Sequence, residues 1–298
     1  MPSRTLFIDF HVPDSIRWPA PAKVNLGLHV LRRRPDGFHD VQTVMAPLGW
    51  SDLLVARTSD RFSFSCSDQE LPTDSGNLVV RAANLLATWA EVELNLAIHL
   101  EKWVPYGAGL GSGSSDAAAT LLLLVDVLGL ETPLAELMDM AAELGSDVPF
   151  FLQKSAALAT SRGEVISTLN TAQGRPYRMP FELVVAVPPV VVSTAEAYGM
   201  ITPNDRDRPN LATLVLSNDL AEWRTHLVND FEAAILAREP VIAQTKRTLL
   251  DARAGYASLS GSGAAVFGVF EDSSDAQEAA STLQAGGCRV WIEPAASL

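Results

Sequence analysis

The feature that most restricts what this chain can fold into is a glycine-rich stretch that runs straight into an apolar segment. Glycine stands at every second position, at Gly107, Gly109, Gly111 and Gly113. Packed helices and strands do not need so many residues without a Cβ. A loop needs them where φ is positive or where backbone N–H groups approach a ligand closely. The stretch is therefore predicted to be a ligand-binding loop, with a flexible linker as the alternative.

A helix is predicted directly after this loop. Ser114, Ser115 and Asp116 favour the start of a helix. Residues 117–128 are mostly apolar, and Gly129 is a suitable C-terminal stop. A glycine loop that leads into a helix N-terminus presents free N–H donors and the positive end of the helix dipole. Such an arrangement favours an anion, most often a phosphate.

The loop is not one of the widespread nucleotide-binding loops. Gly113 is followed by Ser114, where a Walker A loop requires Lys. In the dinucleotide fingerprint G-x-G-x-x-G, Ser114 would replace the third glycine. The lipase elbow G-x-S-x-G is absent as well. The sequence therefore indicates a phosphate loop of another class.

Composition limits the possible partners and compartment. The chain has 298 residues, 48% of them hydrophobic and 19% charged, which is typical of a globular protein of one large or two medium domains. Its net charge of −13 argues against nucleic-acid binding, so an anionic substrate must be held by local features. Cys66 and Cys288 make no disulfide framework, and the apolar stretch 117–130 is too short to span a membrane. We expect a cytoplasmic protein with no membrane partner; oligomeric state is left open.

The order of the predicted elements indicates an α+β fold, with antiparallel strands beside helices. Strands are expected at 22–31, 38–47, 52–56, 94–100 and 182–187, and helices at 77–90, 134–144, 221–237 and 241–252. A polar segment with Gly174 and Pro176 suggests a domain boundary. The predicted division is a leader of uncertain order at 1–17, an N-terminal domain at 18–169 and a C-terminal domain at 170–298.

Three further segments stand out beside the loop. They are Pro19-Ala-Pro-Ala-Lys-Val-Asn-Leu26, Gly145-Ser-Asp-Val-Pro-Phe-Phe151 and Leu259-Ser-Gly-Ser-Gly-Ala-Ala-Val-Phe267. Together with Pro105–Ser115, they resemble the motifs of the GHMP kinases, in the family's order, over nearly the whole chain from Trp18. This resemblance implies a two-domain α+β fold, with an N-terminal domain like ribosomal protein S5 domain 2 and a ferredoxin-like C-terminal domain. It also implies an ATP-dependent small-molecule kinase.

The resemblance assigns the chemistry of phosphoryl transfer to two residues. Asp147 would be the base that accepts the proton of the acceptor hydroxyl, and Lys23 would be the cation beside it. A nearby cation favours the ionised carboxylate. A structural ion pair is the alternative for these two residues.

ATP binding is implied for the glycine loop and for two positions outside it. The residues are Asn77, Lys102, Pro105, Gly107, Gly109, Leu110, Gly111, Ser112, Gly113, Ser114 and Ser115. The hydroxyl of Ser114 or Ser115 could also reach Mg²⁺, which prefers oxygen ligands.

One segment indicates which class of acceptor alcohol the kinase uses. It is Arg34-Pro-Asp-Gly-Phe-His39, followed by Gln42-Thr43. It resembles members of the family that act on a cytidine diphosphate alcohol of the non-mevalonate isoprenoid pathway. His39 would hydrogen-bond the cytosine, and Phe38 and Tyr198 would stack on it, with core packing as the alternative for these two rings. Asn25 is the fourth substrate-binding residue implied.

Two alternative functions stay open. They are another GHMP kinase, such as homoserine or mevalonate kinase, and a non-catalytic nucleotide-binding module.

One segment departs from the family's pattern. It is Leu152-Gln-Lys154-Ser155, which is charged where the family usually has a small turn.

Overall fold

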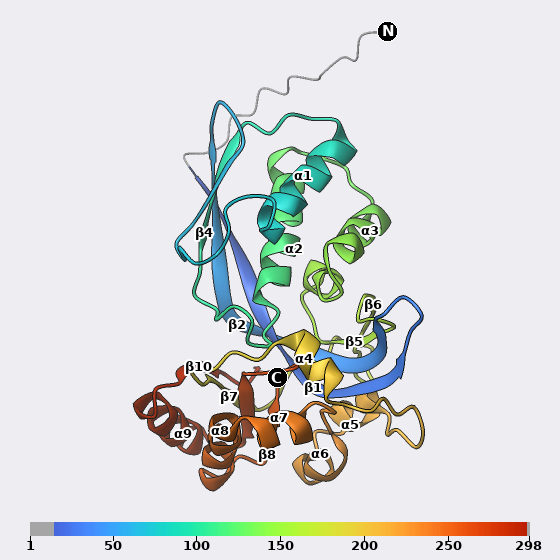
Figure 1. The fold of residues 1–298 in the computed structure, drawn as a ribbon, viewed down its shortest axis with the longest axis vertical. Coiled ribbons are helices and arrows are strands. Elements are labelled where there is room, and N and C mark those ends of the chain that lie inside the picture. Colours follow the sequence, from blue (N-terminus) through green and yellow to red (C-terminus); the bar gives the residue numbers. More distant parts are fainter. Residues whose placement is uncertain (1–14, 297–298) are drawn as a thin grey trace. The chain divides into compact units, whose positions relative to one another are not determined.

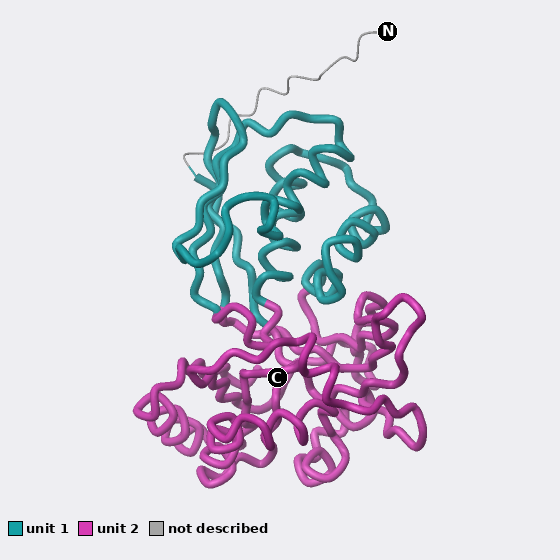
Figure 2. The backbone as a smooth tube through the Cα atoms, in the orientation of Figure 1, with its two compact units in different colours: residues 1–22, 51–104, 112–153 teal, residues 23–50, 105–111, 154–298 magenta. Residues whose placement is uncertain are grey.

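The computed structural model describes residues 15–296 and divides into two compact units (Figure 2). Unit 1 comprises residues 1–22, 51–104 and 112–153, and unit 2 comprises residues 23–50, 105–111 and 154–298, each within the described range. Because the units interleave along the chain, the predicted boundary between consecutive domains at 169 and 170 stays a prediction. Most of the predicted leader lies outside the described residues, but Ile16 and Arg17 already belong to the first strand.

Two long strands run through both units, and each unit adds its own partners to them. The strands are β1 (Ile16–Arg33) and β2 (His39–Thr58), which pair with each other. In unit 1, β2 pairs antiparallel with β4 (Leu96–Glu101), which pairs parallel with β3 (Ser63–Cys66). In unit 2, β2 pairs antiparallel with β5 (Ala157–Thr160), which pairs with β6 (Val165–Thr168).

Helix α2 (Ser112–Val127) is the central helix of unit 1. It is buried on most of its surface, as expected of a helix that is apolar on all sides. It packs against α1 (Leu78–Ala90), α3 (Leu134–Leu144) and the 3₁₀ helix η1 (Val148–Leu152), and Figure 1 shows α1 and α2 beside β2 and β4. The predicted stop is confirmed, since Gly129 has a φ of +58° just after the helix.

The second sheet, in unit 2, has the strand order β10-β7-β9-β8, with every pair antiparallel. Its strands are β7 (Glu182–Val187), β8 (Tyr256–Leu259), β9 (Val266–Phe270) and β10 (Arg289–Glu293). Helix α8 (Pro240–Asp251) packs on β8 and β9, and α9 (Ser273–Ala285) packs on β7, β9 and β10. Numbered in chain order, the strands lie 4-1-3-2, as in a ferredoxin-like βαββαβ unit. The expected α+β class is confirmed.

Four short helices join β7 to α8. They are α4 (Thr194–Gly199), α5 (Leu211–Ser217), α6 (Leu220–His226) and α7 (Glu232–Arg238). The sequence predicted one helix over 221–237, and this is wrong. The chain leaves the helical path between α6 and α7 because its backbone pairs with Leu28 of β1. The Leu28 N–H donates to the Val228 oxygen, and the Leu28 oxygen accepts from the Asp230 N–H. Long-range pairing to a strand outweighs the local helical pattern there.

The strand prediction also needs one correction. Segments 38–47 and 52–56 were expected as separate strands, but residues 39–47 and 52–56 belong to the single strand β2. Between them, Gly49 and Trp50 keep the extended conformation. Within the part of the chain that the structure describes, no helix has both the length and the apolar character needed to cross a bilayer.

Candidate active site

The glycine loop has the backbone conformation that its spacing predicts. Gly107, Gly109 and Gly111 have φ angles of +68°, +80° and +70°, whereas Gly113 lies in the first turn of α2. A Cβ on Gly109 would lie 2.0 Å from the carbonyl oxygen of Ser260, but a Cβ on Gly107 would meet no atom within 4 Å. Gly109 is therefore required by close packing within unit 2, while Gly107 leaves its side of the backbone open to a ligand.

Short hydrogen bonds join the loop to two other motifs in unit 2. The Lys23 N–H donates to the Leu110 oxygen at 3.0 Å, and the Ala265 N–H donates to the Ala108 oxygen at 2.9 Å. The Ser260 hydroxyl donates to the Gly109 oxygen at 2.9 Å. The loop thus joins two segments that lie 86 and 151 residues from it in the sequence, so the three motifs form one unit.

Lys23 lies at this junction and is 3% exposed. Its Nζ donates to Asn25 Oδ1 at 2.6 Å and to the Gly109 oxygen at 3.0 Å. Asn25 Nδ2 in turn donates to Thr43 Oγ1 at 3.0 Å, and the Thr43 hydroxyl donates to the Gly27 oxygen at 2.6 Å. Asn25 and Thr43 therefore fix the direction of the Lys23 ammonium group.

A second lysine with a buried side chain, Lys102, follows β4 in unit 1 and contacts the start of α2. Lys102 Nζ donates to Asp52 Oδ2 at 2.5 Å, Ser112 Oγ at 2.5 Å and Asp116 Oδ2 at 2.9 Å; these four residues are called the Lys102 cluster below. Asp52 Oδ1 also accepts from the N–H groups of Trp103 and Val104. The cluster ties the first turn of α2 to strand β2, which holds the helix N-terminus in place.

The charges of the Lys102 cluster are strongly coupled. Burial raises the pKa of Asp116 to about 7, and the Asp52 carboxylate acts in the same direction, although Lys102 opposes both. Burial by itself would lower the pKa of Lys102, but Asp116 and Asp52 raise it overall. Lys102 is therefore a stable cation, and the pKa of Asp116 lies above that of an exposed carboxylate.

Asp147 stands at the N-terminus of η1 in unit 1, and it is half-buried. The turn before it is closed by the Val148 N–H, which donates to the Gly145 oxygen at 3.2 Å. A Cβ on Gly145 would lie 4.0 Å from Ser114 Oγ, so this turn passes the first turn of α2. Lys23 belongs to unit 2 and Asp147 to unit 1, and their pairing remains a prediction.

Comparison with known proteins decides the family. The family model "GHMP kinases N terminal domain" matches residues 77–155, and "GHMP kinases C terminal" matches residues 211–287. The 4-diphosphocytidyl-2-C-methyl-D-erythritol kinase of Salinibacter ruber is 47% identical over 93% of this chain and 97% of that protein. The chain belongs to the GHMP kinase family. It is thus an ATP-dependent small-molecule kinase, as the sequence motifs implied.

Other GHMP kinases are also similar to this chain, in sequence or in fold. The enzyme of the same name from Chlorobium limicola is 41% identical over 91% of this chain and 94% of its own. A crystal structure of 4-(cytidine 5'-diphospho)-2C-methyl-D-erythritol kinase superposes with a TM-score of 0.77 at 34% identity, covering 93% and 98% of the two chains. Homoserine kinase from Cytophaga hutchinsonii, at 22% identity and a TM-score of 0.72 over 98% of each chain, shares the fold.

Among the residues predicted to bind the acceptor of this GHMP kinase, the structure brings His39 and Tyr198 together. Their rings stack with centroids 4.7 Å apart and planes 16° apart, and Tyr198 packs edge-on against Phe231. Burial and Arg33 lower the pKa of His39, so its imidazole is neutral at pH 7. Phe38 is 51% exposed and lies under the Arg162 guanidinium, at 5.1 Å from its ring centroid.

The predicted ATP-binding residues outside the loop have structural roles of their own in this kinase. Asn77 caps α1, since its Oδ1 accepts from the Val79 N–H at 2.9 Å. The Lys102 ammonium is bound inside its cluster. Both remain predictions as nucleotide contacts.

Sequence reasoning missed several residues that position these groups. Thr43 and Ser260 lie within motifs that the sequence singled out, and a serine or threonine among glycines and strand residues is the signal that could have found them. Asp52 carries no local signal. It is identified only by strand register, because Leu53 pairs with Glu101 and Asp52 thus comes opposite Lys102.

The first turn of α2 offers oxygen ligands of the kind that Mg²⁺ prefers. Ser115 Oγ and Asp116 Oδ1 are buried and make no hydrogen bond within the described residues. Residues 15–296 contain no group of three or more His, Cys, Asp and Glu side chains placed to hold a metal. Mg²⁺ commonly keeps several waters and binds nucleotide phosphates besides one or two protein oxygens, so the donor types present fit it.

Proposed function

We propose that this kinase transfers the γ-phosphoryl group of ATP to the 2-hydroxyl of 4-(cytidine 5′-diphospho)-2-C-methyl-D-erythritol, in the non-mevalonate isoprenoid pathway. The observation that carries the proposal is its 47% identity, over 93% of the chain, to a relative that bears the name of this enzyme. The stacked pair His39 and Tyr198 supports it, because an aromatic face beside a neutral imidazole suits a pyrimidine base.

Each group has a role that phosphoryl transfer requires. Backbone N–H groups of residues 106–115 bind the ATP phosphates at the N-terminus of α2. The Lys23 ammonium, directed by Asn25, stabilises negative charge on the reacting oxygens, and Asp147 accepts the proton of the acceptor hydroxyl. Ser114 or Ser115 would hold Mg²⁺, which would neutralise phosphate charge.

An acceptor panel tests the function directly. Release of ADP is measured with ATP and Mg²⁺ in the presence of the cytidine diphosphate alcohol, homoserine, mevalonate or galactose. We expect turnover with the cytidine compound alone. Turnover with one of the other acceptors would replace the substrate, and no ADP release with any of them would favour a non-catalytic nucleotide-binding protein.

Replacing Asp147 tests the general base. Asp147→Asn keeps the shape of the side chain but cannot accept the proton, so we expect single-turnover transfer to fall about 10²- to 10⁴-fold. The ATP dissociation constant and the melting temperature should stay near those of the wild type. Asp139→Asn, an exposed change in α3 of the same unit, is the matched control and should have no effect. Transfer within a few-fold of the wild type would remove Asp147 from the chemistry.

Replacing His39 tests cytosine recognition. His39→Ala removes a hydrogen-bonding partner of the base, and we expect the KM for the cytidine substrate to rise by a factor equivalent to about 1–3 kcal/mol. The KM for ATP should not change. His226→Ala, at an exposed position of α6, is the control. A rise in the ATP constant instead would place His39 in the nucleotide site.

We infer that the kinase acts in the cytoplasm. Cys66 and Cys288, both half-buried, are free thiols, which suits a reducing compartment.

A further inference from the structure

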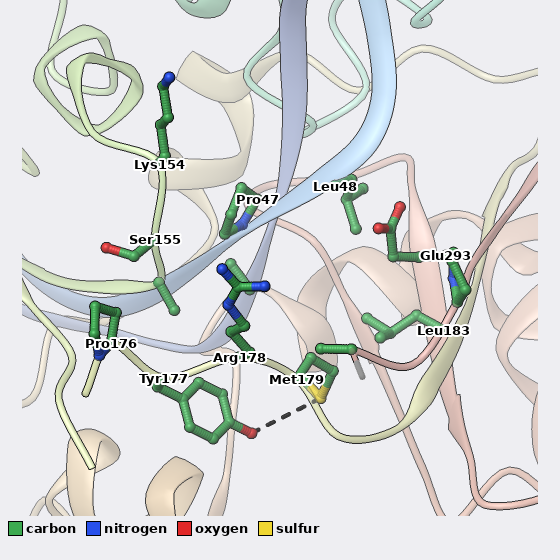
Figure 3. A pocket seen from close by; sticks show the side chains of 14 residues that line it. Pro47, Leu48, Lys154, Ser155, Pro176, Tyr177, Arg178, Met179, Leu183 and Glu293 are labelled. Carbon is green, nitrogen blue, oxygen red and sulfur yellow. Dashed lines mark hydrogen bonds between the residues drawn. The ribbon is translucent and has the colours of Figure 1, made fainter. Parts of the chain in front are cut away.

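Unit 2 contains a cavity of about 480 Å³ that none of the predicted catalytic, ATP or acceptor residues lines (Figure 3). Four stretches of the chain form it: the middle of β2, the charged turn after η1, the segment before β7, and the end of β10 with the residues that follow it. Its volume lies in the range of small-molecule sites. The turn is the one that departs from the family's usual pattern, so the cavity contains a feature that the proposed kinase reaction does not use.

One side of the cavity is apolar. Leu48 and Leu183 are 4% and 1% exposed, and Pro47 and Met179 complete this wall beside them. Figure 3 shows Pro47, Leu48, Met179 and Leu183 around the same space. Because such a wall makes no hydrogen bonds, it favours a ligand with an apolar body.

The other side carries two cations that are exposed to solvent, Arg178 and Lys154. Within residues 15–296, neither side chain takes part in a hydrogen bond or an ion pair. Some other exposed arginines, such as Arg238 and Arg253, pair with carboxylates of the chain. Figure 3 shows the Arg178 guanidinium beside Pro47, while Lys154 extends from the rim.

The only carboxylate that lines the cavity, among the residues described, is already bound elsewhere. Glu293 Oε2 accepts from the Gly49 N–H at 2.6 Å and from Trp291 Nε1 at 2.8 Å. The Tyr177 hydroxyl is also engaged, since it donates to Asn218 Oδ1 at 2.7 Å. Among the described residues Glu293 forms no ion pair with Arg178, so the charge of Arg178 is available to a ligand.

We propose that this cavity is a second binding site, for a small organic phosphate whose apolar body lies on the Pro47–Leu48–Met179–Leu183 wall. The planar guanidinium of Arg178 binds the phosphate oxygens through two parallel hydrogen bonds, and Lys154 adds a second positive charge at the rim. A ligand for this site is an oxyanion with an apolar body. We expect its anionic group to be a phosphate and not a carboxylate. The proposal does not depend on the identity of the acceptor alcohol.

Calorimetric titration of the full chain with a series of alkyl phosphates tests the site. A non-hydrolysable ATP analogue is kept at saturation to occupy the nucleotide site. We expect one molecule of butyl, hexyl or octyl phosphate to bind, with affinity rising about three- to four-fold for each methylene that reaches the wall. Inorganic phosphate, hexanol and hexylammonium should bind at least ten-fold more weakly than hexyl phosphate, and hexanoate several-fold more weakly.

Two surface variants sharpen the test, since both are expected to fold. Arg178→Glu should weaken hexyl phosphate at least ten-fold. Arg175→Glu makes the same change of charge three residues away, at an exposed position outside the cavity, and should change the affinity less than two-fold.

Four results would overturn the proposal. They are an equal loss in the two variants, no binding of hexyl phosphate while the ATP analogue saturates its site, an affinity independent of chain length, and hexanoate binding as tightly as hexyl phosphate. The first two would indicate general electrostatics or binding at the glycine loop. The third would exclude the apolar wall, and the fourth would exclude selection of phosphate.

Discussion

Lys23 in unit 2 and Lys102 in unit 1 are both almost entirely buried, but the groups that hold them differ. The oxygens that accept from Lys23 within its own unit belong to neutral groups, the Asn25 amide and the Gly109 carbonyl. Lys102 is bound by two carboxylates, those of Asp52 and Asp116, together with a hydroxyl. Within its own unit, Lys23 is thus oriented by neutral dipoles, whereas Lys102 is the centre of an ion cluster.

The difference bears on what each lysine does. Carboxylates around a buried ammonium compensate its charge and make it part of the fold, because removing it leaves buried anions behind. Neutral oxygens orient an ammonium group by their dipoles. We therefore propose that Lys102 holds the start of α2 in place, and that Asn25 and Gly109 orient Lys23 for the proposed chemistry.

The same substitution at both lysines should separate these roles, and this is the largest effect expected. Lys102→Met leaves Asp52 and Asp116 without their cation, so the free energy of unfolding should fall by about 3–5 kcal/mol. Lys23→Met should lower turnover by about 10²-fold or more and destabilise the protein less, by about 1–3 kcal/mol for the lost hydrogen bonds. Urea unfolding and single-turnover transfer measure the two effects.

A partial rescue serves as the control for the lysine pair. In the double variant Lys102→Met, Asp116→Leu, only one buried carboxylate is left without its cation. This variant should recover part of the lost free energy of unfolding. If Lys23→Met destabilised the protein as much as Lys102→Met while retaining turnover, the contrast between the two lysines would be wrong.

The loop beside Lys23 provides the next test. Gly109→Ala and Gly107→Ala both place a Cβ at a positive φ, which costs about 1–2 kcal/mol in each case. Only at Gly109 does the new Cβ meet backbone, 2.0 Å from the Ser260 oxygen. We expect an additional loss of about 1–3 kcal/mol for Gly109→Ala, measured by thermal melting. Equal melting temperatures would show that the loop can move away from the second glycine turn.

His29, further along β1, is a buried group without polar partners, in contrast to Lys23. Neither ring nitrogen makes a hydrogen bond within the described residues, and burial, aided by Arg208 and opposed by Asp230, lowers its pKa to about 4. The unfolded state, with a pKa near 6.5, takes up the proton first, so stability is lost as the pH falls from 6.5 towards 4.

The expected loss from His29 is about 2 kcal/mol between pH 7.5 and pH 5. His29→Leu should remove this part of the pH dependence, and melting curves of the two proteins across that range measure it. An unchanged slope in the variant would assign the acid sensitivity to other groups.

Much of the candidate site could be predicted because its signals are local. Alternating glycines permit positive φ angles within a few residues. The apolar run after Ser112–Ser115 is long enough to predict a buried helix from local sequence alone. The motif around Lys23 and Asn25 was likewise recognisable, since two polar residues at alternate positions share one face of a strand. The helix predicted over 221–237 failed because its interruption depends on hydrogen bonds to Leu28, some 200 residues earlier.

The sequence by itself therefore determined the conformation of the glycine loop, the helix that follows it and membership of the kinase family. Only the tertiary structure decided which buried charges meet. Asp52, Lys102 and Asp116 come together through the register of β2 with β4 and the packing of α2. The cavity beside Arg178 is likewise formed by four separate stretches of chain. Local patterns report backbone preferences over a few residues, whereas the electrostatic environment of a buried group is set by whichever distant segments the fold packs around it.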